Sequence, residues 1–181
     1  MVRVQAGDEA ALRALMERWE LPVKRLLGRI VQSAAEAEEL AQETFVRVWQ
    51  QRARFRAGAE FRPWLFAIAV NLARNRLRWW RRRPQVSLEA WGGDEPEGTG
   101  EIGPAPAPSG GEAAEAAERA AAVRRAVAAL PLDQRETLVL FEYEGLSHAE
   151  IAAALGGTPK GAEARLYRAR ASLRVTLQRW L

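Results

Sequence analysis

The chain has 181 residues, with 27 Lys or Arg against 23 Asp or Glu, and a formal net charge of +4. It has no cysteine and one histidine, His148, which excludes disulfides, thiolate metal sites and a histidine-built zinc site. No apolar run reaches membrane-spanning length and the N-terminus has no signal-peptide core, so we expect a cytoplasmic protein without membrane insertion.

The charge is distributed in blocks. Residues 1–83 hold 17 basic and 9 acidic residues, residues 84–118 hold 8 acidic and no basic ones, and residues 119–181 hold 10 basic and 6 acidic ones. Basic blocks attract phosphate backbones, whereas a uniformly acidic segment is repelled by them. Residues 84–112 are also rich in Gly and Pro, which predicts a flexible linker between two small domains, 1–83 and 113–181.

The first domain reads as helical. Apolar residues recur at helical spacing in its first half, with Pro22 as a candidate kink. Ser33 and Glu36 form an S-x-x-E capping box that opens a second helix. The predicted helices cover residues 12–31, 35–49 and 61–83.

A basic loop (residues 52–60) precedes the third predicted helix. Arg54 and Arg56 flank Phe55, and Phe61 follows, an arrangement able to hold a single strand or an extruded base. For Phe61 and Trp64 we favour the other interpretation, in which they form the core face of the helix.

The third predicted helix ends in the run RNRLRWWRRR. Such a dense cationic end favours phosphate contacts, and Trp79 and Trp80 among the arginines can stack on unpaired bases. The alternatives are a solvated basic end that suits the helix dipole and tryptophans that pack on the core.

An acidic face interrupts this basic domain. Glu39, Gln42 and Glu43 occupy adjoining positions at i, i+3 and i+4 of the second predicted helix, opposite its apolar residues. Such a face should avoid DNA, and it predicts a docking surface for a basic protein partner. The alternative is an ordinary solvated helix face.

The second domain carries a predicted helix-turn-helix. Ser147 and Glu150 form another capping box, Gly156-Gly157 supplies a turn, and Thr158-Pro159 starts a second, basic helix. Two helices joined by a tight turn suit the DNA major groove. Helices are also predicted over residues 112–129 and 132–143, and no strand pattern is present, so the fold class is all-α.

With these motifs assembled, the chain resembles a bacterial RNA polymerase sigma factor of the extracytoplasmic-function type, in the sigma-70 family. The stretch AEAEELAQETFVRVWQ followed by FRAGAEFRPWLFAIAVNLAR looks like region 2, and LPLDQRETLVLFEYEGLSHAEIAAALG with RLYRARASL looks like region 4. The resemblance implies a subunit that binds core RNA polymerase and directs initiation at −10 and −35 promoter elements.

The resemblance also assigns residues. For core polymerase, through the β′ clamp coiled coil, it implies Glu39, Gln42 and Glu43; contact with the β flap is implied as well. For the −10 element it implies Arg54, Phe55, Arg56, Phe61, Asn71, Arg74 and Arg78. For the −35 element it implies Lys160, Glu163, Ala164, Arg165, Tyr167 and Arg168. The linker would thread the polymerase interior.

The recognition helix departs from the family pattern. Its start reads Lys160-Gly-Ala-Glu-Ala-Arg165, and Glu163 stands where a basic residue is common. A carboxylate there accepts from cytosine N4 but repels phosphate, so we expect this segment to set the chain's own −35 specificity.

Two other functions compete with this one. A stand-alone helix-turn-helix regulator would explain the second domain but gives no purpose to the acidic face, the basic loop or the linker. An enzyme acting on nucleic acid is the weakest alternative, because the sequence has no metal carboxylate cluster, no phosphate-cradling glycine loop and no nucleophile–base pair. We therefore expect no catalytic activity, no cofactor and no metal. A flexible linker would permit an anti-sigma factor to hold the two domains together.

Overall fold

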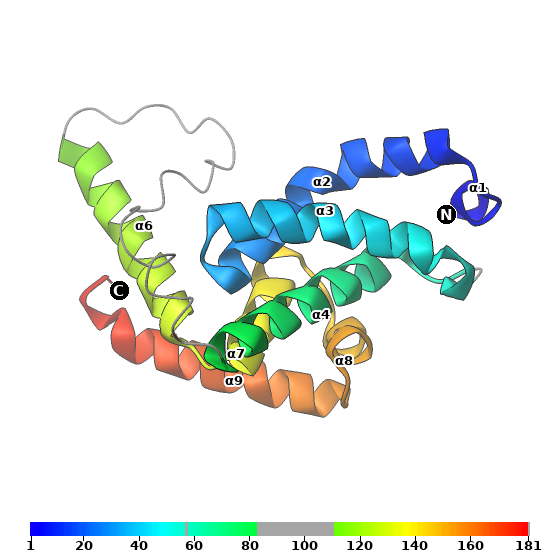
Figure 1. Ribbon diagram of the computed structural model, residues 1–181. Coiled ribbons are helices and arrows are strands. Elements are labelled where there is room, and N and C mark those ends of the chain that lie inside the picture. The colour runs from blue at the N-terminus through cyan, green and yellow to red at the C-terminus, as the bar shows by residue number, and fades with distance from the viewer. Residues whose placement is uncertain (57, 83–110, 181) are drawn as a thin grey trace.

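The computed structural model describes residues 1–56, 58–82 and 111–180, and within them all regular structure is helical (Figure 1). The prediction of an all-α fold is therefore confirmed. The elements in chain order are α1 (Val2–Gln5), α2 (Glu9–Val31), α3 (Ala34–Gln50), η1 (Arg52–Arg54), α4 (Phe61–Arg82), α6 (Gly111–Ala129), α7 (Leu132–Leu138), η3 (Val139–Tyr143), α8 (His148–Leu155), α9 (Pro159–Thr176) and η4 (Gln178–Trp180).

The helix boundaries differ from the prediction in a few places. α1 was not predicted, and α6 begins at Gly111, inside the predicted linker, whose residues 84–110 lie outside the described residues. α2 runs as one helix with Pro22 inside it, so the proline does not end the helix. The predicted helix 132–143 forms as α7 and then continues as the π-helix η3.

Side-chain caps explain where the first helices start. The Asp8 carboxylate accepts from the Ala11 amide at 2.9 Å and begins α2, and the Ser33 hydroxyl accepts from the Glu36 amide and begins α3. The Ser33 cap was predicted. The Glu36 carboxylate, predicted to complete a capping box, contacts the guanidinium of Arg76 on α4.

The helix-turn-helix forms as predicted. The Ser147 amide donates to the Glu150 carboxylate at 2.7 Å and the Glu150 amide to the Ser147 hydroxyl at 3.3 Å, which completes the capping box of α8. Gly156 and Gly157 have φ of 79° and 120°, a region that favours glycine. The Thr158 hydroxyl then accepts from Gly161 and starts α9.

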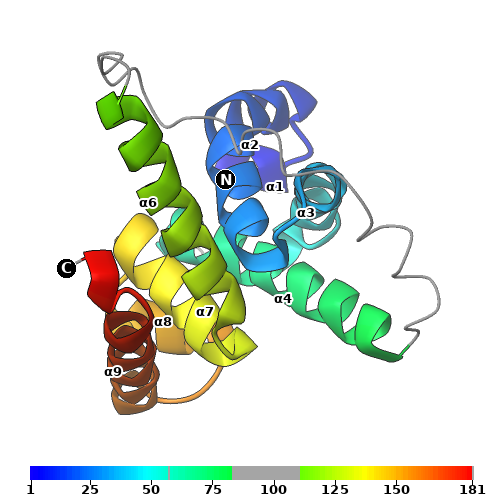
Figure 2. The same ribbon diagram turned by 90° about the vertical axis from the view of Figure 1, so that its left-hand side faces the viewer.

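One hydrophobic core joins the two predicted domains. The fully buried residues of α2, α3 and α4, such as Leu27, Leu40 and Phe66, form one cluster with Leu140 and Ile151 from the second half. α8 packs against α4, while α6, α7 and η3 contact α2. The helices that follow residue 110 therefore lie against those that precede residue 83 (Figures 1 and 2). None of the described helices is both long and apolar enough to cross a membrane.

Candidate polymerase and nucleic-acid interfaces

The acidic face lies on the outer side of α3. Glu39 and Gln42 are exposed, and the Glu43 side chain is 38% exposed. Glu43 pairs with Arg47 on the next turn at 3.0 Å, and Glu39 lies 3.3 Å from the guanidinium of Arg76. Exposed ion pairs of this kind contribute little to folding. The three side chains can therefore be redirected to a partner at small energetic cost.

The basic loop is held on an aromatic cluster. The Phe55 ring is buried and lies 5.2 Å from the Trp64 ring and 6.3 Å from the Phe61 ring, in edge-to-face geometry. Phe61 also meets Trp19 of α2 at 5.9 Å. The core interpretation of Phe61 and Trp64 therefore describes this structure, and Phe55 shares it.

Two of the three arginines of the basic loop face solvent. Arg54 and Arg56 are both exposed, on either side of the buried Phe55. Arg52 differs, since its guanidinium lies 4.1 Å from the Trp49 ring centre and donates to the Trp49 carbonyl at 2.7 Å. The loop thus presents two guanidinium groups on an apolar base.

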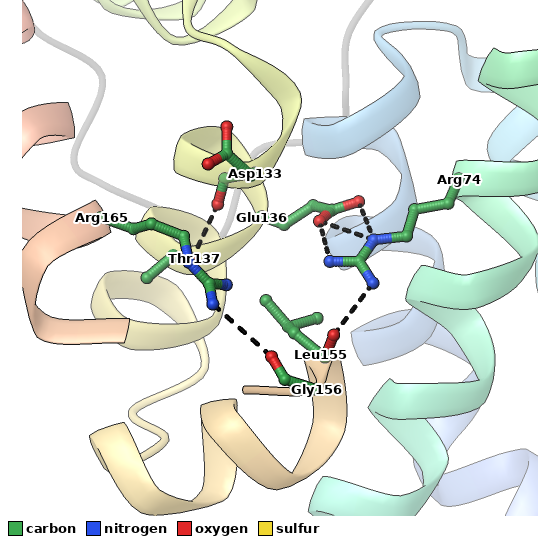
Figure 3. A network of polar contacts seen from close by, with 7 residues as sticks. All are labelled: Arg74, Asp133, Glu136, Thr137, Leu155, Gly156 and Arg165. Atoms are coloured by element: carbon green, nitrogen blue, oxygen red, sulfur yellow. Dashed lines mark hydrogen bonds and ion pairs between the residues drawn. The ribbon is translucent and has the colours of Figure 1, made fainter. Parts of the chain in front are cut away.

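The candidate −10 residues of α4 fall in two environments. Asn71 and Arg78 are exposed. Arg74, by contrast, reaches Glu136 of α7, with Nε 2.8 Å and Nη2 2.6 Å from Oε2, and its Nη1 donates to the Leu155 carbonyl at 3.2 Å (Figure 3). Arg74 is therefore bound to the second half of the chain and not displayed on the surface.

Glu136 is an acidic group without solvent contact. Its side chain is 0% exposed. Burial raises its pKa, because a charged carboxylate is costly away from water, and the Arg74 guanidinium opposes that rise. Two ion-paired nitrogens of Arg74 offset part of the desolvation cost of the charge.

A second set of contacts joins α2 and α4 to the end of η3 and to the residues that follow it. The Arg29 guanidinium lies 4.2 Å from the Tyr143 ring centre, and Arg62 donates to the Gly145 carbonyl at 3.4 Å. Burial raises the pKa of the adjacent Glu144, while Arg29 and Arg62 lower it by their charge. Polar contacts thus supplement the shared core at this interface.

The recognition helix α9 has one buried and one exposed face. Leu166 and Ala169 are buried, whereas Tyr167 is 75% exposed. The other candidate −35 residues that face solvent are Lys160, Glu163 and Arg168, and Ala164 is half-buried.

Arg165 has a local role in this motif. Its Nη2 donates to the Gly156 carbonyl at 3.5 Å (Figure 3). A Cβ at Gly157 would lie 3.0 Å from the same nitrogen, so the side chain packs closely over the turn. Arg165, which the family resemblance assigns to the −35 element, is thus bound to the turn of its own helix-turn-helix in this structure.

Two residues of these sites were missed by the sequence interpretation. Glu136 had a signal, since it lies one helical turn from both Leu132 and Leu140 and so falls on an apolar face. The second is Gln5 of α1, whose side-chain amide donates to the backbone carbonyls of Arg52 and Phe55 in the basic loop. It had no signal in the sequence, because these partners are 47 and 50 residues away. Within the part of the chain that the structure describes, no group of three or more His, Cys, Asp or Glu is placed to hold a metal.

Two successive parts of the chain match two regions of the Sigma-70 family. Residues 15–83 match Sigma-70 region 2, and residues 120–173 match Sigma-70 region 4. It is 32% identical over 177 residues to RNA polymerase sigma-H factor of Pseudomonas aeruginosa, which covers 97% of this chain and 91% of that protein. It is 33% identical over 172 residues to ECF RNA polymerase sigma-E factor of Escherichia coli K12, covering 94% and 88%.

Solved structures agree with these matches. The sigma factor RpoE of Bartonella quintana, in complex with the anti-sigma factor NepR, aligns with a TM-score of 0.67 and 25% identity over 92% of this chain and 98% of that one. CnrH, in complex with the cytosolic domain of CnrY, aligns with a TM-score of 0.65 and 26% identity over 98% and 94%. The chain therefore belongs to the extracytoplasmic-function sigma factors of the sigma-70 family.

Proposed function

We propose that this chain is a promoter-specificity subunit that binds core RNA polymerase and directs initiation at −10 and −35 elements. The observation that carries the proposal is that two solvent-facing sets of cations, on the basic loop with α4 and on α9, share one chain with a separate acidic face on α3. A stand-alone helix-turn-helix regulator needs only α8 and α9, and the matches to both sigma regions do not favour it.

The acidic face is the proposed docking site for core polymerase. Glu39, Gln42 and Glu43 offer carboxylate and amide oxygens on one helix side, suited to the basic side chains of a partner helix such as the β′ clamp coiled coil. Region 4 would contact the β flap. The proposed units are residues 1–83 for docking and −10 recognition, 84–112 as linker, and 113–181 for −35 recognition.

Recognition of the −10 element is assigned to the basic loop and α4. The exposed Arg54, Arg56 and Arg78 supply phosphate contacts, and Asn71 supplies an amide that can read a base edge. Phe55 and Phe61 would stack on an unpaired base only after the aromatic cluster opens, since Phe55 is buried.

Recognition of the −35 element is assigned to the exposed face of α9. The exposed Glu163 and Tyr167 would read bases, while the exposed Lys160 and Arg168 would contact phosphates. Ala164 would meet a base edge through its methyl group. A carboxylate at Glu163 favours cytosine, whose N4 amino group is a donor.

The partners of this function follow from its class. RpoE of Bartonella quintana was co-crystallised with the anti-sigma factor NepR, and an anti-sigma factor is a proposed partner here. We also propose that the chain catalyses no reaction itself and acts in the cytoplasm, where core polymerase and promoter DNA are found.

Binding assays with purified core polymerase test the docking assignment. Replacing Glu39, Gln42 and Glu43 together by Ala should weaken core binding by at least about tenfold, because several interface contacts are lost at once. The control is Glu17→Ala with Glu115→Ala, which also removes two negative charges from exposed helix positions. Equal weakening in both proteins would mean that net charge and not the acidic face determines binding.

A further inference from the structure

The N-terminal helix α1 contacts the basic loop through one side chain. The Gln5 amide nitrogen donates to the Phe55 carbonyl at 2.8 Å and to the Arg52 carbonyl at 3.1 Å. α1 lies before residue 15, where the match to Sigma-70 region 2 begins. Gln5 therefore belongs to a segment outside both matched regions, whereas the two carbonyls that it binds lie within region 2.

Gln5 is itself held in place. Its neighbour Val4 is 0% exposed. The chain then turns at Gly7, with φ of 88°, into Asp8, which caps α2 and pairs with Arg3 at 2.7 Å. α1 is thereby fixed to the first long helix, and the Gln5 amide is fixed with it.

The two carbonyls that Gln5 binds lie on either side of Arg54 in the chain. Arg52 and Phe55 stand at either end of a short turn in which the Phe55 amide also bonds the Arg52 carbonyl at 3.2 Å. Arg54 lies between them and is exposed. Anchoring both carbonyls therefore fixes the direction from which the Arg54 side chain leaves the loop.

We propose that Gln5 is a positioning residue for −10 recognition: its amide holds the carbonyls of Arg52 and Phe55 and so orients the exposed Arg54 and Arg56 toward the promoter strand. This inference rests on the proposed function. A carboxamide carries two N–H donors, and each has one carbonyl acceptor here. A carboxylate at the same place has no N–H to donate, and its negative oxygens would repel the carbonyl oxygens of Arg52 and Phe55.

The isosteric variant Gln5→Glu tests the proposal. Holoenzyme assembled from core polymerase and each full-length protein is titrated with a single-stranded oligonucleotide carrying the non-template −10 sequence, and core affinity is measured in parallel. We expect Gln5→Glu to weaken oligonucleotide binding about tenfold or more, because the loop loses two hydrogen bonds. Core affinity should stay within about twofold of the parent, because the substitution leaves the residues of the acidic face unchanged. Gln50→Glu, the same change at an exposed site at the end of α3, is the control and should bind like the parent.

Each outcome decides between the possibilities. Unchanged oligonucleotide binding by Gln5→Glu, or an equal loss in Gln50→Glu, overturns the proposal. A parallel loss of core affinity overturns it too, since it shows a general structural role. Gln5→Met, which keeps the length and removes the donors without adding charge, should show the same selective loss even if the charged variant folds poorly. If the parent holoenzyme itself binds no −10 strand, the proposed function fails and not only the role of Gln5.

Discussion

The guanidinium of Arg74 on α4 is bound to the buried carboxylate of Glu136 on α7. The two residues lie 62 positions apart in the sequence, one on each side of the predicted linker. Arg74 is one of the candidate −10 residues, and in this structure its nitrogens are occupied by Glu136 and the Leu155 carbonyl. Contact between Arg74 and promoter DNA therefore requires α4 and α7 to separate.

Removing the guanidinium should destabilise the protein. Arg74→Ala leaves the Glu136 carboxylate buried without its ion pair, and we expect the free energy of unfolding to fall by about 3 kcal/mol or more. Arg119→Ala, which breaks an exposed pair with Glu115 on α6, should cost about 0.5 kcal/mol or less. Urea denaturation of the three proteins measures both values, and similar losses would show that the buried pair has no special weight.

The stability of the protein should also depend on pH through Glu144, which lies where α2 and α4 meet the second half of the chain. Burial raises the pKa of this carboxyl above its ordinary value of 4.5, and Arg29, Arg62 and Arg25 only partly oppose the rise. The folded protein therefore binds the proton more tightly than the unfolded chain, so the contribution of Glu144 to stability falls as the pH rises from the ordinary through the raised pKa.

The variant Glu144→Gln isolates this contribution. It removes the titrating group and leaves the other carboxyls unchanged. We expect the variant to gain stability relative to the parent as the pH is raised from mildly acidic to neutral, in urea denaturation at several pH values. A constant difference between the two proteins across that range would contradict the pKa assignment.

The recognition helix offers a test of specificity. Glu163 is exposed on α9, and Glu163→Lys should change which −35 sequences support initiation, because a carboxylate and an ammonium select different base edges. Selection from a promoter library randomised at −35 measures the change, with core affinity as the parallel readout. Glu115→Lys, an equal charge change on the exposed side of α6, should leave the preference as it was. A shift of preference in the control, or a loss of core affinity with Glu163→Lys, would contradict the assignment.

Local signals were enough to predict most of the fold. Capping residues such as Ser147 and Thr158 and the positive-φ glycines after α8 act within a few residues, so the helix-turn-helix could be read from the sequence. Apolar periodicity likewise located α2, α3 and α4. Helix α1 was not predicted, because a helix of four residues is too short to show a hydrophobic periodicity.

The arrangement of the candidate site depends on distant contacts and could not be predicted in the same way. The basic loop appeared able to offer Phe55 to a base, yet the ring is buried against Trp64, because a basic loop sequence does not say which way its one aromatic residue points. The pairing of Arg74 with Glu136 depends on how two halves pack across a long connection. No periodicity within either half specifies it.

The most direct test of the account is run-off transcription with purified core RNA polymerase on a promoter library, with and without this chain. The account predicts that defined transcripts appear only when the chain is present. It further predicts that they are lost when Glu39, Gln42 and Glu43 are replaced by Ala. Transcripts that do not depend on the chain, or tight promoter binding by the chain alone that persists at high salt, would contradict the assignment as a polymerase specificity subunit.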